Sequence, residues 1–155
     1  MTLILSKKYN PLFDSKARYF IITGGRGSGK SFAVTVFLTL LTMSRGIRVL
    51  FTRFTMTSAH LSIIPEFLEK IGLLGFDETF NINKSEVVNA KNKSDILFRG
   101  IKTSAGNQTA SLKSLQGIST WVLDEAEELV DENIFDTIDL SIREKKVQNR
   151  IILVL

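Results

Sequence analysis

Short apolar runs alternate along this chain with longer segments whose apolar residues follow helical spacing. Four of the short runs are rich in β-forming residues, which is typical of buried strands. They are residues 18–23, 48–52, 120–123 and 150–155. Residues 30–43 are apolar but too long for a strand, and residues 58–71 have helical spacing, with Pro65 predicting a kink or a late start. An acidic helix is predicted near residues 131–141.

The middle of the chain changes character. Three β-rich runs between residues 79 and 100 are separated only by short polar turns, which predicts an antiparallel meander. Residues 102–117 are rich in Ser, Thr, Gly, Asn and Gln, which predicts a long, mobile loop. Because the other strands alternate with helices, we expect an α/β fold with a mostly parallel sheet, helices on both faces and the meander inserted.

Composition limits the class of protein without naming its activity. A chain of 155 residues with 44% hydrophobic content can bury one core, and the absence of cysteine excludes disulfide scaffolds and thiolate metal sites. No apolar run approaches membrane-spanning length, so we expect a soluble, cytoplasmic protein without membrane contacts. Residues 1–60 hold nine basic residues and one acid, whereas residues 61–155 hold eleven and fifteen. The basic half fits a polyanionic partner and equally a solvated basic face.

Residues 24–31 read GGRGSGKS, the phosphate-loop pattern in which two glycines bracket four residues before Lys and Ser. The pattern stands between a predicted strand and a predicted helix, where backbone amides and the helix dipole form an anion cradle. Lys30 would reach the β and γ phosphates of ATP, and the Ser31 hydroxyl would ligate Mg²⁺. The predicted cofactor-binding residues are Gly24, Gly25, Arg26, Gly27, Ser28, Gly29, Lys30 and Ser31.

Two acids follow the strand at residues 120–123. In a mostly parallel sheet, the carboxyl end of this strand and the glycine loop lie at the same edge, where such sheets bind ligands. We therefore assign Asp124 to the metal and Glu125 to catalysis, as the group that orients and deprotonates the attacking water. With Lys30 among the catalytic residues, these assignments predict a P-loop ATPase of the catalytic-glutamate type.

Arg26 places a full positive charge inside the glycine loop. Its guanidinium could simply point to solvent. Alternatively, it lies across the γ phosphate and neutralises the charge that builds up during phosphoryl transfer, as an arginine finger supplied in cis. We favour the second interpretation and count Arg26 among the catalytic residues.

Residues 92–95 read NKSD, which matches the guanine-reading motif of GTPases. They precede the Asp124 strand and fall in a polar turn of the predicted meander. We interpret them as turn-forming residues instead.

Several of these segments together resemble the ATPase domain of the large terminase subunit of tailed bacteriophages and prophages. The resemblance is carried by GGRGSGKS after an aromatic-rich strand, LFTR at 50–53, KSLQG at 113–117 and WVLDEAEEL at 121–129. It implies a motor that hydrolyses ATP with Mg²⁺ and packages double-stranded DNA into procapsids in the bacterial host cytoplasm. It also implies a homo-oligomeric ring that works with a small terminase subunit and a portal.

The resemblance extends to individual positions and to the length of the chain. Lys113 lies nearest to the basic position that some family members use to reach a neighbour's ATP, and Tyr9-Asn10-Pro11 has asparagine where the family often has an adenine-contacting glutamine. We expect residues 1–155 to form a single ATPase domain, truncated before the coupling motif and the nuclease domain of that family.

Two other functions stay open at this point. Asp124-Glu125-Ala126-Glu127 is close to the DEAD-type box of superfamily 2 helicases. The chain could also be a module that binds ATP and barely turns it over, since the predicted strand at 150–155 is its last element.

Overall fold

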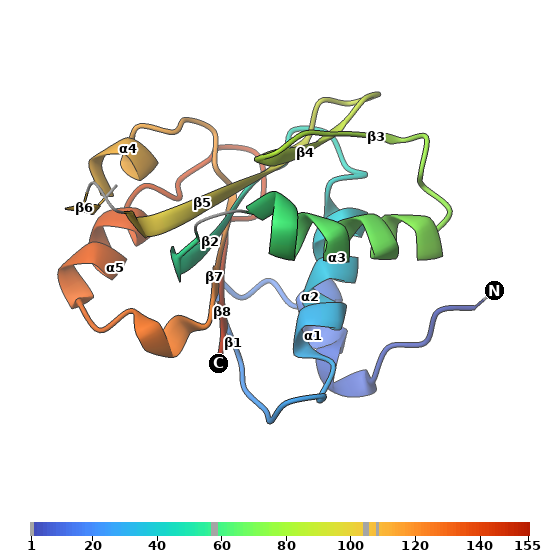
Figure 1. The fold of residues 1–155 in the computed structure, drawn as a ribbon, viewed down its shortest axis with the longest axis horizontal. Helices are drawn as coiled ribbons and strands as arrows, with labels where there is room; N and C mark the ends of the chain where they lie inside the picture. Colours follow the sequence, from blue (N-terminus) through green and yellow to red (C-terminus); the bar gives the residue numbers. More distant parts are fainter. Residues whose placement is uncertain (1, 57–58, 104–105, 108) are drawn as a thin grey trace.

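The computed structural model describes residues 2–56, 59–103, 106–107 and 109–155 (Figure 1). Its strands are β1 (Tyr19–Ile22), β2 (Arg48–Thr55), β3 (Phe80–Ile82), β4 (Glu86–Asn89), β5 (Asp95–Thr103), β6 (Gly106–Asn107), β7 (Thr120–Asp124) and β8 (Arg150–Val154). Its helices are α1 (Asn10–Asp14), α2 (Lys30–Leu41), α3 (Ala59–Leu73), α4 (Thr109–Lys113) and α5 (Glu132–Asp139), with 3₁₀ turns η1 (Lys7–Tyr9) and η2 (Ala126–Glu128). In this described part of the chain, every helix is too short or too polar to cross a membrane.

The strands form one sheet in the order β1-β8-β7-β2-β5-β4-β3, with β6 paired to β5 outside this path. All neighbours from β1 to β5 run parallel, whereas β3, β4 and β6 join antiparallel to their partners. The predicted α/β fold with a mostly parallel sheet is therefore confirmed. The meander is also confirmed as antiparallel, although its last strand, β5, belongs to the interior of the sheet because it pairs parallel with β2.

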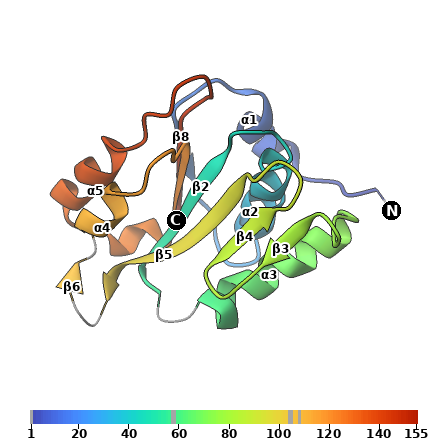
Figure 2. The ribbon, with the colours of Figure 1, turned by 90° about the horizontal axis from the view of Figure 1, so that it is seen from above.

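Helices cover both faces of the sheet, as predicted (Figures 1 and 2). One apolar core lies under α1, α2 and α3 and includes Phe37, Phe67 and Phe98, the last two of which pack edge to face with ring centroids 5.2 Å apart. The other core lies under α4 and α5 and is built around Trp121 and Ile138. The first core contains several aromatic rings, and a pair of this geometry stabilises by about 1 kcal/mol beyond its area burial.

The prediction of a long loop at residues 102–117 is wrong for the part of it that the structure describes. The segment contains the β6 pair and the helix α4, and Leu112 of that helix is only 2% exposed. Leu115, three residues later, is packed against the same core as Leu112. Leu112 within α4 and Leu115 just after it both face this core, but the polar residues around them hide the pattern. Residues 104, 105 and 108 lie outside the described part of the chain.

The helix at residues 58–71 is observed as α3, which starts at Ala59 and runs through Pro65 without the late start that was one of the two expectations. Residue 58 lies outside the described part of the chain. Pro65 lies on the exposed face of the helix, and its missing backbone N–H removes one hydrogen bond from the helix.

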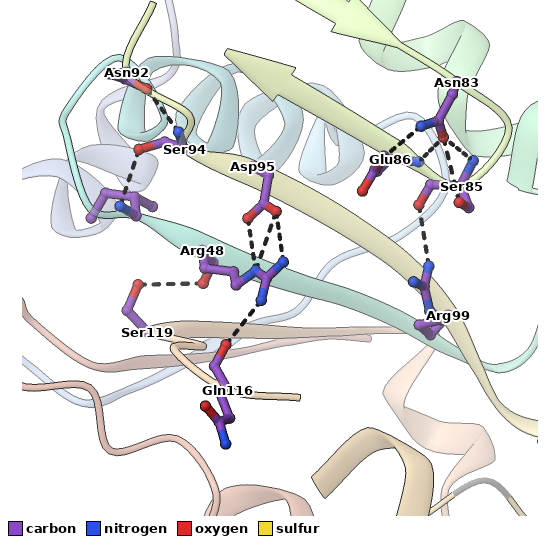
Figure 3. A network of polar contacts seen from close by, with 11 residues as sticks. Arg48, Asn83, Ser85, Glu86, Asn92, Ser94, Asp95, Arg99, Gln116 and Ser119 are labelled. Carbon is purple, nitrogen blue, oxygen red and sulfur yellow. Dashed lines mark hydrogen bonds and ion pairs between the residues drawn. The ribbon is translucent and has the colours of Figure 1, made fainter. Parts of the chain in front are cut away.

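Residues 92–94 lie in the turn between β4 and β5, as predicted, whereas Asp95 is the first residue of β5 (Figure 3). The Asn92 side-chain oxygen accepts a 2.8 Å hydrogen bond from the Ser94 amide, and its side-chain amide donates to the Thr42 and Met43 carbonyls at the end of α2. Lys93 has a φ of 67°, in the left-handed region. Since the side chain of Asn92 is used to join a turn to the end of a helix, it is not presented to a guanine base.

Candidate functional site

The glycine loop leaves β1 after Ile22 and enters α2 at Lys30. Gly24 has a φ of 152°, and a Cβ at this position would lie 2.9 Å from the Ser28 Oγ. Gly29 is the N-cap of α2 with a φ of 82°, which other residues adopt only with strain. The loop therefore needs glycine at both ends to turn back sharply and point its amides toward the start of the helix.

Side chains from outside and inside the loop hold its backbone in place. The Tyr9 hydroxyl donates a 2.9 Å hydrogen bond to the Ser28 carbonyl, and the Lys8 Nζ donates to the same oxygen at 3.2 Å. The Lys30 Nζ donates to the carbonyls of Gly24 and, at 3.2 Å, of Gly25. Nothing in the sequence pattern pointed to the support from η1, because it depends on how the amino-terminal segment folds over the loop.

The register of the sheet brings the loop and the two acids together. Val154 of β8 is aligned with Ile22 of β1 on one side and with Asp124 of β7 on the other. Since neighbouring strands lie about 4.8 Å apart, the start of the loop and the acid strand are separated by about 10 Å. The predicted meeting of two segments about a hundred residues apart in sequence is therefore seen in the structure.

Between them lies a cleft of about 480 Å³. Its walls are Gly25, Arg26, Gly27, Ser28, Gly29, Lys30, Ser31, Phe32, Arg53, Asp124, Glu125, Glu127, Val154 and Leu155. All predicted residues of the loop and both acids are thus in one place, except that Gly24 stays outside the walls and takes part through its carbonyl. Lys113 is exposed at the end of α4 and does not line the cleft.

Asp124 and Glu125 occupy different environments at the end of β7. Asp124 is 7% exposed. Glu125 has the left-handed dihedrals φ 53° and ψ 48° and a half-exposed side chain. A non-glycine residue in this region is strained by about 1–3 kcal/mol, and such strain is concentrated at functional sites. Both residues line the cleft on either side of this sharp turn.

Arg53 lines the cleft, although the sequence pattern assigned it no role. It follows Thr52, which is aligned with Leu123, so its side chain comes to lie beside Asp124. The Arg53 Nε and Nη2 both lie 2.8 Å from the Asp124 Oδ2, and Nε lies 3.9 Å from the Glu125 Oε2. A basic residue at the end of an apolar strand was visible in the sequence, but its partner followed only from the strand order.

The donor set of the cleft fits a phosphate chain with Mg²⁺. The Ser28 Oγ is buried without a hydrogen-bond partner among the described residues, so the loop holds a polar atom that a ligand could satisfy. Ser31 offers a hydroxyl oxygen, and Asp124 and Glu125 offer carboxylate oxygens, which are the hard donors that Mg²⁺ prefers. Arg26 is exposed at the cleft and forms no hydrogen bond or ion pair with the residues that the structure describes.

Comparisons with known proteins identify the family and the fold of this chain. The family model described as phage terminase large subunit matches residues 16–155. A comparison with curated proteins gave no match. The sequence left open a terminase motor and a superfamily 2 helicase. This family match favours the terminase.

Three solved structures show how far the fold likeness extends. The large terminase of bacteriophage HK97 is 10% identical with a TM-score of 0.72, over 98% of this chain and 33% of that one. The large terminase of a thermophilic bacteriophage, solved in complex with ADP, is 11% identical with a TM-score of 0.70, over 97% and 38%. The amino-terminal domain of the DNA packaging ATPase from bacteriophage phi29 is 17% identical with a TM-score of 0.67, over 96% and 79%.

The chain spans about a third of the length of the large terminases that it matches. At these identities the structures support the fold alone, whereas the family model covers nearly the whole sequence. The chain therefore belongs to the phage terminase large subunit family.

Proposed function

We propose that this chain is the ATP-hydrolysing motor domain of a terminase large subunit and drives double-stranded DNA into a procapsid. The observation that carries the proposal is the cleft in which the GGRGSGKS loop faces Asp124 and Glu125. Solved large terminases of a thermophilic bacteriophage in complex with ADP and with ATP-γ-S support a nucleotide as the ligand of this cleft.

In this proposal the loop binds the phosphates. The amides between Gly25 and Ser31 donate to phosphate oxygens at the positive end of the α2 dipole. In the structure, the Lys30 Nζ donates hydrogen bonds to two loop carbonyls. When nucleotide binds, it would donate to the β and γ phosphates instead. Ser31 and Asp124 hold Mg²⁺, which when bound would neutralise phosphate charge during phosphoryl transfer.

Glu125 and Arg26 act on the reacting end of the nucleotide. The Glu125 carboxylate is half exposed and can accept a proton from a water molecule in the cleft. Arg26 also lines the cleft, and its guanidinium has no competing partner among the described residues, so it can turn to the γ phosphate. Charge stabilisation of this kind contributes about 10³-fold or more to phosphoryl transfer.

A second cavity is the proposed place of the adenine base. It has a volume of about 410 Å³, and Tyr9, Pro11 and Thr23 are among its walls. Thr23 begins the glycine loop, and the Tyr9 hydroxyl bonds the loop backbone at Ser28, so this cavity adjoins the phosphate-binding segment. An aromatic ring beside an apolar wall fits a planar base.

The proposed partners follow from the family. They are double-stranded DNA, a small terminase subunit, a portal and further copies of the chain in a ring, inside the bacterial host cell. A solved bacteriophage Phi-29 viral genome packaging motor assembly supports an assembly of this kind, with a TM-score of 0.64. Exposed Lys113 is the proposed contact to a neighbour's nucleotide, and residues 1–155 are the proposed ATPase domain.

The test compares nucleotide binding with turnover. Steady-state phosphate release is measured with and without duplex DNA, alongside titration with a fluorescent ATP analogue. We expect binding that depends on Mg²⁺ and phosphate release that DNA accelerates. Binding with negligible release, with or without DNA, would instead support the nucleotide-binding module, and no binding at all would reject the proposal.

A further inference from the structure

We propose that this chain associates with a second copy of itself through two surfaces of opposite charge. One is a basic surface at the amino ends of the parallel strands, and the other is an acidic surface on α5. The inference rests on the proposed function, in which further copies of the chain are partners, and it assigns the surfaces that meet.

The basic surface is made by the segments that lead into the five parallel strands. Each segment ends on the first residue of a strand, and together they are residues 15–19, 42–48, 90–95, 114–120 and 140–150. This basic edge holds ten basic residues and two acids, whereas the rest of the chain holds ten basic residues and fourteen acids. Half of the basic residues are therefore gathered at one end of the sheet.

Backbone hydrogen bonds hold the ends of these segments in one row across the sheet. The Asp95 amide donates to the Ile47 carbonyl at 3.0 Å. The Ser119 amide donates to the Arg48 carbonyl at 2.9 Å, and the Arg150 amide donates to the Ser119 carbonyl at 2.9 Å. Figure 2 shows the loops before β1, β2, β5 and β8 along its upper side. With strands about 4.8 Å apart, the row presents its charges in a fixed arrangement about 19 Å long.

Much of the positive charge on the basic edge is not neutralised within the chain. Arg45, Arg143 and Lys145 are exposed, and their side chains form no hydrogen bond or ion pair with the residues that the structure describes. Asp95, one of the two acids of the edge, is already paired with Arg48. Like charges fixed near one another repel, and an anionic partner would relieve this repulsion.

The acidic surface lies on α5. Residues 124–139 hold eight acids and no basic residue. The exposed carboxylates of α5 and its N-cap, which we call the acidic face, belong to Asp131, Glu132 and Asp136. Glu132 and Asp136 are four residues apart and so share one side of the helix, where two like charges destabilise it. The helix keeps this unfavourable pair exposed, which fits a surface that meets a cationic partner.

A protein partner explains both surfaces, whereas DNA would explain only the basic edge. Val130, next to the acidic face, is 90% exposed, and Leu140, in the basic edge, is 57% exposed. Apolar side chains gain from burial in a protein interface and find little to contact on a phosphate backbone. Because the two surfaces differ, the contact is heterologous, so the basic edge of each copy can meet the acidic face of the next and close into a ring.

Sedimentation velocity without nucleotide measures the association over a range of protein and KCl concentrations. We expect the wild type to associate at low salt and to dissociate as KCl screens the charges. Two double variants reverse one surface each. They are Arg45→Glu with Lys145→Glu on the basic edge, and Glu132→Lys with Asp136→Lys on α5. Each should raise the dissociation constant by about tenfold or more, because two attractions become repulsions.

A mixture of the two double variants tests the pairing of the surfaces directly. In an equimolar mixture, the reversed edge of one variant meets the reversed helix of the other, and each unchanged surface meets its unchanged counterpart. Association should therefore return to about wild-type strength, although each variant alone associates poorly. Mixing would not repair a damaged fold, so this result separates docking from misfolding.

Lys7→Glu with Lys84→Glu is the control, because it changes the net charge as much as the basic-edge variant does, at exposed residues outside both surfaces. It should associate as the wild type does. A wild type that stays monomeric at low salt, reversals without effect, or a mixture that does not associate would each overturn the inference. It also fails if reversal of the basic edge lowers only the affinity for a labelled DNA duplex.

Two further measurements keep the outcomes distinct. If a reversed variant does not fold, the neutral variant Arg45→Gln with Lys145→Gln should still raise the dissociation constant, and an unchanged value decides against the inference. Nucleotide binding is measured separately with a fluorescent ATP analogue. A wild type that associates but binds no analogue would reject the proposed function and leave this pairing of surfaces standing.

Discussion

The Trp121 indole nitrogen donates a 2.9 Å hydrogen bond to the Thr52 hydroxyl, and both residues are completely buried. Thr52 in turn donates to the Val122 carbonyl at 2.9 Å. These two bonds connect β2 to β7 through side chains, one position before Arg53 on the first strand. They thus stabilise the alignment that sets Arg53 beside Asp124.

Replacing Thr52 with valine should lower the free energy of unfolding by about 1–3 kcal/mol. The exchange keeps the shape but removes the acceptor of the buried Trp121 N–H and one donor to the Val122 carbonyl. Urea unfolding followed by tryptophan fluorescence measures the loss. Thr120→Val is the control, because the Thr120 Oγ1 is buried and has no hydrogen-bond partner in the part of the chain that the structure describes, so its removal should be neutral or stabilising. Equal losses in both variants would contradict a specific role for the bond.

Lys30→Ala should weaken nucleotide binding by about tenfold or more. Hydrogen bonds from a charged group contribute about 1.5–3 kcal/mol, and in the proposal Lys30 makes them to phosphate. A fluorescent ATP analogue titrated against the variant measures the affinity. The exposed Lys7, replaced by alanine, controls for the loss of one positive charge and should bind as the wild type does. Unaltered affinity in Lys30→Ala would place the phosphates elsewhere.

Glu125→Gln should bind ATP and fail to hydrolyse it. Glutamine keeps the size of the side chain but cannot accept a proton from water. Single-turnover measurements with labelled ATP detect the trapped nucleotide. Glu128→Gln is the matched control, because this exposed glutamate lies outside the walls of the cleft. Hydrolysis by Glu125→Gln at the wild-type rate would show that another group acts as the base.

Arg26→Ala should leave nucleotide affinity largely unchanged and slow turnover by about 10³-fold. Its guanidinium is expected to act on charge that develops during the reaction, so the effect falls on the rate and spares ground-state binding. Phosphate release at saturating ATP measures the change. Should the rate match that of the wild type, Arg26 would be a solvent-exposed residue without a catalytic role.

The wild type should lose stability as pH rises through the pKa of Asp95, whereas the Asp95→Asn variant should not. The stability of the variant relative to the wild type should therefore increase with pH. Burial raises the pKa of Asp95, an effect larger than the opposing attraction of Arg48. The folded chain therefore holds this proton more tightly than the unfolded chain, and the stability that it contributes is lost as pH rises through the raised pKa. Urea unfolding of both proteins from pH 3 to 7 measures the difference between their free energies of unfolding. A difference that does not change with pH would contradict a raised pKa of Asp95.

Features that depend on local sequence pattern could be predicted from the sequence. Contacts that depend on the order of the strands could not. The run of glycines before Lys30 and the acid after an apolar strand have fixed spacing, so both ends of the cleft could be predicted. The sequence pattern assigned no role to Arg53, because its contact with Asp124 follows only from the pairing of β2 with β7. The helix around Leu112 was missed because the buried Leu112 and the partly buried Leu115 stand in an otherwise polar segment.

The position of β8 has a mechanical consequence. Among the described residues, Val154 is the one aligned with both Ile22 and Asp124, and it is 4% exposed. A tilt of this single strand would widen or narrow the space between phosphate loop and carboxylates without changing either wall. The strand thus acts as the spacer that sets the distance between the phosphate loop and the carboxylates.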